Sequence, residues 1–306
     1  MAIASKAPDE IRREPLLLPM MPKELPTDDM VDQVYGMLTT RSLKRKSPPF
    51  PVAIKQVLGK ELSKPEGERK LKFMIIWGGF KNRGEDGSLS TADENDYNVL
   101  KHMKDSLDTI QKATGVKVEA KILFSNVHAV INGRSIEESN AYLNGVDDRM
   151  GLMGMADGLG MEVVPLNQVY LKSDWRGKER IYERTMEVGK RRGLRDFDKF
   201  MEWSEKPEQH PGVQRLIDSA RKHSQHIPQD LLDMDEPARK SASTYYSWRS
   251  FEADMLSKRF SDTTFITFSD TKIPEVNPKA SLYWWTLKHG KTEVPWFTPE
   301  RKEAKV

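Results

Sequence analysis

One histidine in this sequence is well placed for acid–base chemistry. His128 lies in the polar segment Ser125–Arg134, which reads as a loop directly after an apolar run. An imidazole titrates near neutral pH, so it can both accept and donate a proton in a reaction. Asn126, Asn132 and Arg134 share the segment and could orient a polar substrate. The alternative is that the asparagines satisfy backbone groups of the loop and that His128 is half-buried with one partner.

A second group of candidates follows the apolar run at residues 72–77 and consists of Gly78, Gly79, Lys81 and Asn82. The two glycines would let a ligand approach the backbone closely. Lys81 would act in catalysis and supply a positive charge for a phosphate or carboxylate. Neither a G-x-G-x-x-G pattern nor a P-loop is present. The alternative is that these residues form a simple turn after the strand, with Lys81 as a surface lysine.

Three more side chains could complete a substrate site. Glu94 lies near a helix start and could bind a substrate ammonium, although the helix dipole alone favours carboxylates there. Arg249 precedes Glu252 by three residues on a predicted helix, where the two could pair or reach a cleft. Trp296 belongs to an aromatic tail that could form a wall around an apolar substrate.

The composition narrows the possible cofactors and compartments. There is no cysteine, so a metal site would need His, Asp or Glu ligands. His223 and His226 lie three residues apart, which does not suit two ligands on one helix face. We expect neither a metal nor another cofactor.

No apolar stretch is long enough to cross a bilayer, and the first residues make a poor signal peptide. We therefore expect a cytoplasmic protein without a membrane partner.

The elements that must position these residues alternate along the chain. Predicted strands at 72–77, 117–124 and 161–166 are separated by helical patterns at 91–113 and 135–159. This order predicts an α/β fold: a Rossmann-like, doubly wound, mostly parallel sheet with helical additions at both ends. Residues 1–27 read as an extended arm. Residues 28–306 read as a single α/β domain with a C-terminal α+β extension from about residue 193.

The order of these features resembles the isocyanide synthase family, also described as pyoverdine or dityrosine biosynthesis proteins. The resemblance rests on five short segments: Lys46-Ser47-Pro48, Gly78–Lys81, Asp93-Glu94, Ser125–Arg134 and Pro295-Trp296. It implies that an amino acid's amine condenses with the carbonyl of ribulose 5-phosphate to give an isonitrile, without a bound metal. By this resemblance, Lys81 and Arg134 would bind phosphate, His128 would move protons, and the aromatic tail would hold the amino-acid side chain.

Two other classes of protein fit the same residues. A nucleotide-dependent transferase or ligase could hold an adenylate between the Gly78-Gly79 turn and the segment 126–132. A non-catalytic nucleic-acid-binding protein could use the basic clusters at 41–46 and 176–195. The net charge of +3, from 49 basic and 46 acidic residues, argues against a nucleic-acid partner. We therefore favour a transferase or synthase whose partner is a small, amino-acid-like substrate, with phosphorylated compounds among the candidates.

Overall fold

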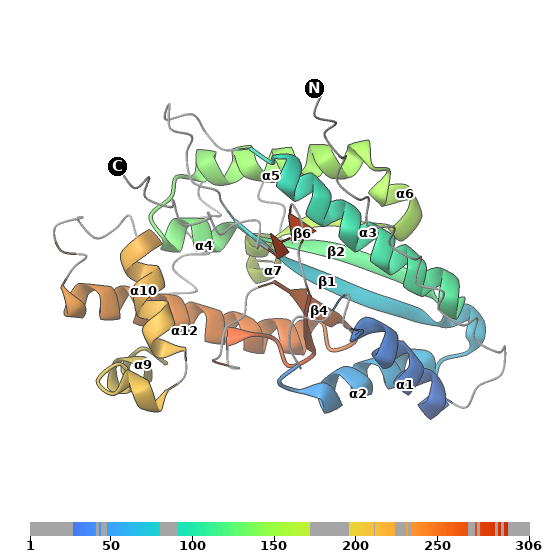
Figure 1. The fold of residues 1–306 in the computed structure, drawn as a ribbon, viewed down its shortest axis with the longest axis horizontal. Coiled ribbons are helices and arrows are strands. Elements are labelled where there is room, and N and C mark those ends of the chain that lie inside the picture. The colour runs from blue at the N-terminus through green and yellow to red at the C-terminus, as the bar shows by residue number, and fades with distance from the viewer. Residues whose placement is uncertain are drawn as a thin grey trace, which may run out of the picture.

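The structure, a computed structural model, has a five-stranded parallel sheet at its centre (Figure 1). It describes residues 27–40, 43, 48–79, 91–171, 196–210, 212–223, 231, 234–268, 273, 276–284, 287–288 and 291–292. The strands are β1 (Lys70–Gly78), β2 (Lys117–Ser125), β3 (Glu162–Pro165), β4 (Thr264–Thr267) and β5 (Ser281–Tyr283). Their spatial order is β3-β2-β1-β4-β5, the order of the doubly wound Rossmann sheet, and it confirms the predicted fold class. A short antiparallel pair, β6 (Leu287–Lys288) and β7 (Lys291–Thr292), forms a second sheet.

Helices cover both faces of the parallel sheet. On one face lie α3 (Glu94–Thr114), α5 (Ile136–Leu152) and α6 (Met155–Leu159), whose apolar side chains form one cluster with the strands. The other face is covered by α4 (Asn126–Ile131), α7 (Leu166–Leu171) and the long α12 (Asp235–Arg259). Figure 1 shows α3 and α5 on one side of β1 and β2 and α12 on the other. The fold therefore has three layers.

The remaining helices extend this core at both ends of the described chain. Before β1 come α1 (Thr27–Leu38), α2 (Pro51–Leu62) and the 3₁₀ turn η1 (Glu66–Glu68), with α1 and α2 packed in the same cluster as α3. Before α12 come α9 (Phe197–Trp203), η3 (Pro207–Gln209) and α10 (Val213–His223). Both α9 and α10 pack on α12 through a separate apolar cluster.

Burial on both faces explains the continuous apolar run of β1. Phe73, Ile75 and Trp77 belong to the cluster on the α3 side. Met74 and Ile76 alternate with them and belong to the cluster on the α12 side. A central strand between two helical layers needs apolar residues at every position. This is why the strand could be predicted from the sequence.

Capping residues set the ends of two helices where the sequence predicts them. Asp93 accepts hydrogen bonds from the backbone of Asn95 and Asp96 at the start of α3, and Ser135 forms a capping box with Glu138 at the start of α5. Gly115 ends α3 with a left-handed φ of 67°. These contacts satisfy backbone groups that a helix end otherwise leaves unpaired.

Two predictions about local structure are wrong. The single helix expected over residues 135–159 is two helices, α5 and α6, because Gly154 takes a left-handed φ of 58° between them. The polar loop expected after β2 is the helix α4. Its side chains Val127 and Ile131 lie in the apolar cluster on the α12 face, and the burial of these residues favours a helix over an exposed loop.

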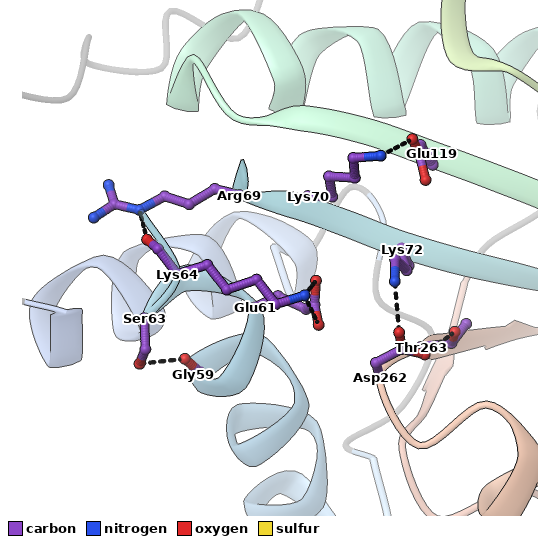
Figure 2. A network of polar contacts seen from close by, with 10 residues as sticks. All are labelled: Gly59, Glu61, Ser63, Lys64, Arg69, Lys70, Lys72, Glu119, Asp262 and Thr263. Atoms are coloured by element: carbon purple, nitrogen blue, oxygen red, sulfur yellow. Dashed lines mark hydrogen bonds and ion pairs between the residues drawn. The ribbon is translucent and has the colours of Figure 1, made fainter. Parts of the chain in front are cut away.

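Ion pairs occupy the amino edge of the sheet, where the parallel strands begin (Figure 2). The Nζ atom of Lys72 lies 2.5 Å from Asp262, and that of Lys70 lies 2.9 Å from Glu119. Glu61, which is buried at the end of α2, lies 2.8 Å from the Nζ of Lys64. These side chains neutralise one another and give the amino edge a structural role.

No helix among the described residues is long and apolar enough to cross a membrane.

Candidate active site

The carboxyl edge of the sheet, opposite these ion pairs, is where a doubly wound fold binds its ligands. From β1 the chain moves to β2 and β3 on one side of the sheet and later returns to β4 on the other. The neighbours β1 and β4 therefore form a topological switch point, and open α/β sheets bind ligands outside the carboxyl ends of the strands at such a point. The sequence candidates Gly78 and Gly79 lie at this point, at the end of β1.

Gly79 brings the chain after β1 against the start of α4. A Cβ atom at this position would lie 2.0 Å from the carbonyl oxygen of Ser125, so a larger residue cannot fit without a backbone shift. The carbonyl oxygen of Gly79 accepts a hydrogen bond of 2.9 Å from the Ser139 hydroxyl on α5. The second glycine is thus explained by a close backbone approach within the protein itself.

A buried cluster of three titratable side chains lies beside this edge. The Nε2 atom of His128, on α4, lies 2.6 Å from Oε2 of Glu252 on α12. The other carboxylate oxygen of Glu252 accepts a 2.5 Å hydrogen bond from Nη1 of Arg249. The exposed fractions of His128, Arg249 and Glu252 are 6%, 6% and 1%. Two candidates that lie 121 positions apart in the sequence, His128 and Arg249, are therefore joined through Glu252.

The electrostatics of this cluster favour a neutral imidazole beside an ionised carboxylate. Burial alone would raise the pKa of Glu252, but Arg249 and His128 together hold it below its usual value of 4.5. Burial lowers the pKa of His128 below 6.5 and outweighs the opposite effect of Glu252. Because the carboxylate only accepts hydrogen bonds, Nε2 of His128 donates its hydrogen and the lone pair lies on Nδ1. A neutral histidine held in this way by a carboxylate is suited to act as a general base.

Aromatic rings surround the cluster. The ring of Tyr245 meets the imidazole of His128 edge-on, with the centroids 5.6 Å apart. Tyr170, on α7, contacts Trp248 and Phe251 of α12 with centroid distances of 6.1 Å and 5.5 Å. Burial raises the pKa of Tyr170 well above 10, and Glu252 raises it further. Tyr170 therefore stays protonated close to the charged pair.

Asn126 connects the ends of two strands. Its Nδ2 donates to Oδ1 of Asn167 at 3.0 Å, and its Oδ1 accepts from the backbone N–H of Asn167 at 3.3 Å. Asn126 follows β2 and Asn167 follows β3, so these hydrogen bonds hold α4 and α7 together. This places α7 and its Tyr170 beside the helix that carries His128.

The other described candidates have local partners. Asn132 donates from Nδ2 to the backbone oxygen of His128 at 2.8 Å and so caps the end of α4. Arg134 is buried, with Nη1 3.7 Å from Glu138. Glu94 is exposed in the first turn of α3, and no contact joins it to His128 in the described part of the chain. The buried carboxylate of that turn is Asp96, which accepts from the hydroxyl of Tyr142 at 2.8 Å.

Several sequence predictions fall outside the described residues. These are the candidates Lys81, Asn82 and Trp296, the basic cluster at 176–195, the basic residues of the cluster at 41–46, and His226. Within the described residues, no group of three His, Asp or Glu side chains is arranged to hold a metal ion.

Sequence reasoning missed three residues of this site. Glu252 was expected to pair with Arg249 or to reach a cleft with it, and its contact with His128 was not predicted because that contact spans 124 positions. Asn167 and Tyr170 were not singled out at all. A signal was present, because both follow an apolar run, as the other candidates do, and polar side chains after parallel strands gather at one edge of the sheet.

The comparisons with known proteins show a likeness of fold. No family model matches the chain, and a search of curated protein sequences finds no match. Among solved structures, the PvcA protein from Pseudomonas aeruginosa is similar, with a TM-score of 0.62 and 12% identity over 87% of each chain. At this identity the likeness shows that the two chains share a fold over most of their length.

Proposed function

We propose that this protein is a small-molecule biosynthetic enzyme that condenses an amino acid with a pentose phosphate to form an isonitrile. The observation that carries the proposal is the buried cluster of His128, Glu252 and Arg249 beside the carboxyl edge of a doubly wound sheet. The fold shared with PvcA and the sequence resemblance to the isocyanide synthase family both support it.

The first chemical step of such a condensation needs a base. The substrate ammonium must lose a proton before its nitrogen lone pair can attack the carbonyl carbon of the sugar. In the proposed mechanism Nδ1 of His128 takes that proton, and Glu252 stabilises the imidazolium that results. The proton then goes to the carbonyl oxygen as the C–N bond forms. His128 next takes a proton from the newly bonded nitrogen and passes it to the same oxygen, which leaves as water and gives an imine. One histidine that cycles between two protonation states can serve both transfers.

The proposed roles of the other site residues follow from the charge or the apolar character of their side chains. Arg249 neutralises Glu252 and keeps it ionised, so it acts by positioning and polarising its neighbours. Arg134 and Lys81 are the proposed phosphate ligands, because both carry a positive charge and both follow a central strand in the sequence. Trp296 is the proposed wall against the amino-acid side chain.

The test is a direct assay of product. Purified protein is incubated with tryptophan or tyrosine and ribulose 5-phosphate, and isonitrile product is sought by mass spectrometry. We expect turnover by the wild type and a loss of at least about 100-fold in His128→Ala, which removes the proposed base. Asn98→Ala, on the exposed side of α3, is the matched control and should retain full activity.

Other outcomes would point elsewhere. Full activity in His128→Ala would remove His128 from the mechanism. If the wild type forms no isonitrile but consumes ATP in the presence of an amino acid, the nucleotide-dependent transferase or ligase replaces the proposal.

A further inference from the structure

Three buried polar groups beside the His128 cluster have no hydrogen-bond partner among the described residues. They are the hydroxyl of Ser125, the Nδ2 of Asn167 and the hydroxyl of Tyr170. The exposed fractions of these residues are 2%, 0% and 8%. Almost all buried polar groups in folded proteins are paired, because an unpaired one loses its bonds to water without replacement. Three such groups in one region indicate that a ligand supplies the missing partners.

Contacts along the chain bring these groups together. Ser125 immediately precedes Asn126, whose side chain bonds Asn167 in two places. Tyr170 lies one helical turn after Asn167 on α7, so both occupy the same side of that helix. The ring of Tyr170 packs on Trp248 and Phe251, which directly precede Arg249 and Glu252, respectively, in the sequence of α12. The three groups therefore lie between the end of β2 and the charged cluster.

Strand register puts Ser125 on the same face. Leu123 of β2 belongs to the apolar cluster on the α12 side. Ser125 is two residues further along the strand, so its side chain lies on this face as well. It directly precedes α4, but its hydroxyl does not cap that helix. A serine at this position usually bonds the helix backbone, and here its hydroxyl has no such partner.

Two other unpartnered hydroxyls do not share this arrangement. Thr264 and Thr267 both lie in β4 and are three residues apart. Side chains three residues apart on a strand lie on opposite faces of the sheet, so these two do not converge.

The charges nearby decide what kind of ligand these groups suit. Arg249 and Glu252 neutralise each other, and His128 is held neutral, so the cluster has no net charge to offer a phosphate. Ser125 and Tyr170 can both donate and accept, whereas Nδ2 of Asn167 only donates. Such a set matches neutral oxygen atoms, namely the hydroxyl and carbonyl groups of a sugar.

We infer that Ser125, Asn167 and Tyr170 form a subsite that binds the hydroxyl and carbonyl oxygens of a sugar-like substrate beside His128. The identity of that sugar as a pentose phosphate rests on the proposed function. In this arrangement the subsite holds the reacting carbonyl beside His128. The phosphate is bound instead by the proposed cationic ligands, Arg134 and Lys81.

Two substitutions remove one hydroxyl each and keep the shape of the side chain: Tyr170→Phe and Ser125→Ala. Tyr142→Phe is the matched control, because that hydroxyl is paired with Nε1 of Trp77 at 2.9 Å and with Asp96 at 2.8 Å. The experiment measures the dissociation constants of ribulose 5-phosphate, ribulose, inorganic phosphate and ATP by calorimetry, and the urea midpoint of each ligand-free protein.

We expect Tyr170→Phe and Ser125→Ala to weaken the binding of ribulose and ribulose 5-phosphate by about 10-fold each, with inorganic phosphate unaffected. Their urea midpoints should stay the same or rise, because the hydroxyls that they lose have no partner in the free protein. Tyr142→Phe should do the opposite, with a lower midpoint and binding within about twofold of the wild type.

The outcomes separate this inference from the proposed function. Unchanged sugar binding in both variants, or midpoints that fall as in Tyr142→Phe, would overturn the subsite and leave the proposed function standing. Binding of ATP alone, weakened by the same two substitutions, would keep the three groups as ligands of the ribose of a nucleotide and reject the pentose phosphate. A wild type that binds none of the four probes would overturn both.

Discussion

Glu252 is the residue on which the charged cluster depends, because it contacts both His128 and Arg249. All three side chains are buried, so a partner that is removed cannot be replaced by water. The same carboxylate keeps Arg249 neutralised and fixes which nitrogen of His128 carries the hydrogen.

The first prediction concerns this carboxylate. Glu252→Gln should lower the free energy of unfolding by about 3 kcal/mol, because it leaves the buried guanidinium of Arg249 without an opposite charge. Urea unfolding measures the loss. The control is the double variant Arg249→Met/Glu252→Gln, which should recover much of it because no buried charge remains. An equal loss in both proteins would show that the ion pair does not account for the effect.

The second prediction concerns pH. The pKa of His128 in the native protein lies below its usual value of 6.5, so between the two values only the unfolded chain is protonated there. The free energy of unfolding should therefore fall as the pH drops below about 7 and level off below the native pKa. The lowered pKa of Glu252 acts in the same direction below 4.5. Urea unfolding at several pH values measures this slope.

His128→Gln is the control for the pH series, because glutamine does not titrate. Its stability should depend less steeply on pH between about 5 and 7 than that of the wild type. Identical slopes would mean that His128 titrates alike in the native and unfolded chains.

At the scale of elements, the close contact between the end of β1 and the start of α4 positions the site. Gly79 is the residue that permits it, since a Cβ there would overlap the backbone of Ser125. The contact lies three residues before His128 along the chain. An altered path after β1 would therefore shift the helix that carries the proposed base.

Gly79→Ala should accordingly destabilise the protein by about 3 kcal/mol and reduce turnover. Gly151→Ala is the matched control, because a Cβ at that position of α5 meets nothing within 4 Å. That change should stabilise the helix by about 0.5 kcal/mol and leave activity unaltered. Thermal unfolding and the isonitrile assay compare the two variants. Equal stability of both would contradict the close approach.

For the whole molecule, the two edges of the sheet differ in what their polar groups do. At the amino edge, Lys70 pairs with Glu119 and Lys72 pairs with Asp262 (Figure 2), and all four side chains lie partly in solvent. A shallow hollow between α2 and the end of α12 has no carboxylate or imidazole in its lining. At the carboxyl edge, Ser125, Asn167 and Tyr170 have buried polar groups without a partner among the described residues, next to a charged cluster. This difference supports the proposed ligand site at the carboxyl edge.

A substitution at the amino edge tests this division. The side chains of Lys72 and Asp262 are 30% and 33% exposed, so their ion pair is screened by water. Lys72→Met should cost only about 0.5 kcal/mol of stability and leave substrate binding and turnover unchanged. A clear loss of activity in this variant, measured by the isonitrile assay, would show that the two edges are coupled.

Part of the candidate site could be predicted from the sequence because it lies next to strands. The apolar runs before Gly78 and Asn126 mark central strands, and the carboxyl ends of such strands hold ligands in this class of fold. Arg249 was a weaker prediction, since only its spacing to Glu252 marked it. Asn132 was predicted as a substrate ligand, but in the described structure it bonds the end of α4.

The sequence by itself determined the local elements of this protein. Apolar periodicity marked β1, β2 and α3, and the helical patterns expected from residues 91 and 135 begin close to the observed caps Asp93 and Ser135. These signals are local because a helix or strand depends on neighbours within a few positions. The parallel arrangement was also predicted, since parallel neighbours need a long crossover connection and the helical patterns between the strands provide one.

Only the tertiary structure decided which distant residues meet. The contact between His128 and Glu252 depends on the chain crossing from β3 back to β4 along α12, and periodicity does not encode that path. The protonation state of His128 could not be predicted from the sequence either, because burial and the charges of two residues on another helix determine it. The unpartnered hydroxyl of Tyr170 also emerges only from packing, since a sequence cannot show which polar groups burial leaves unpaired.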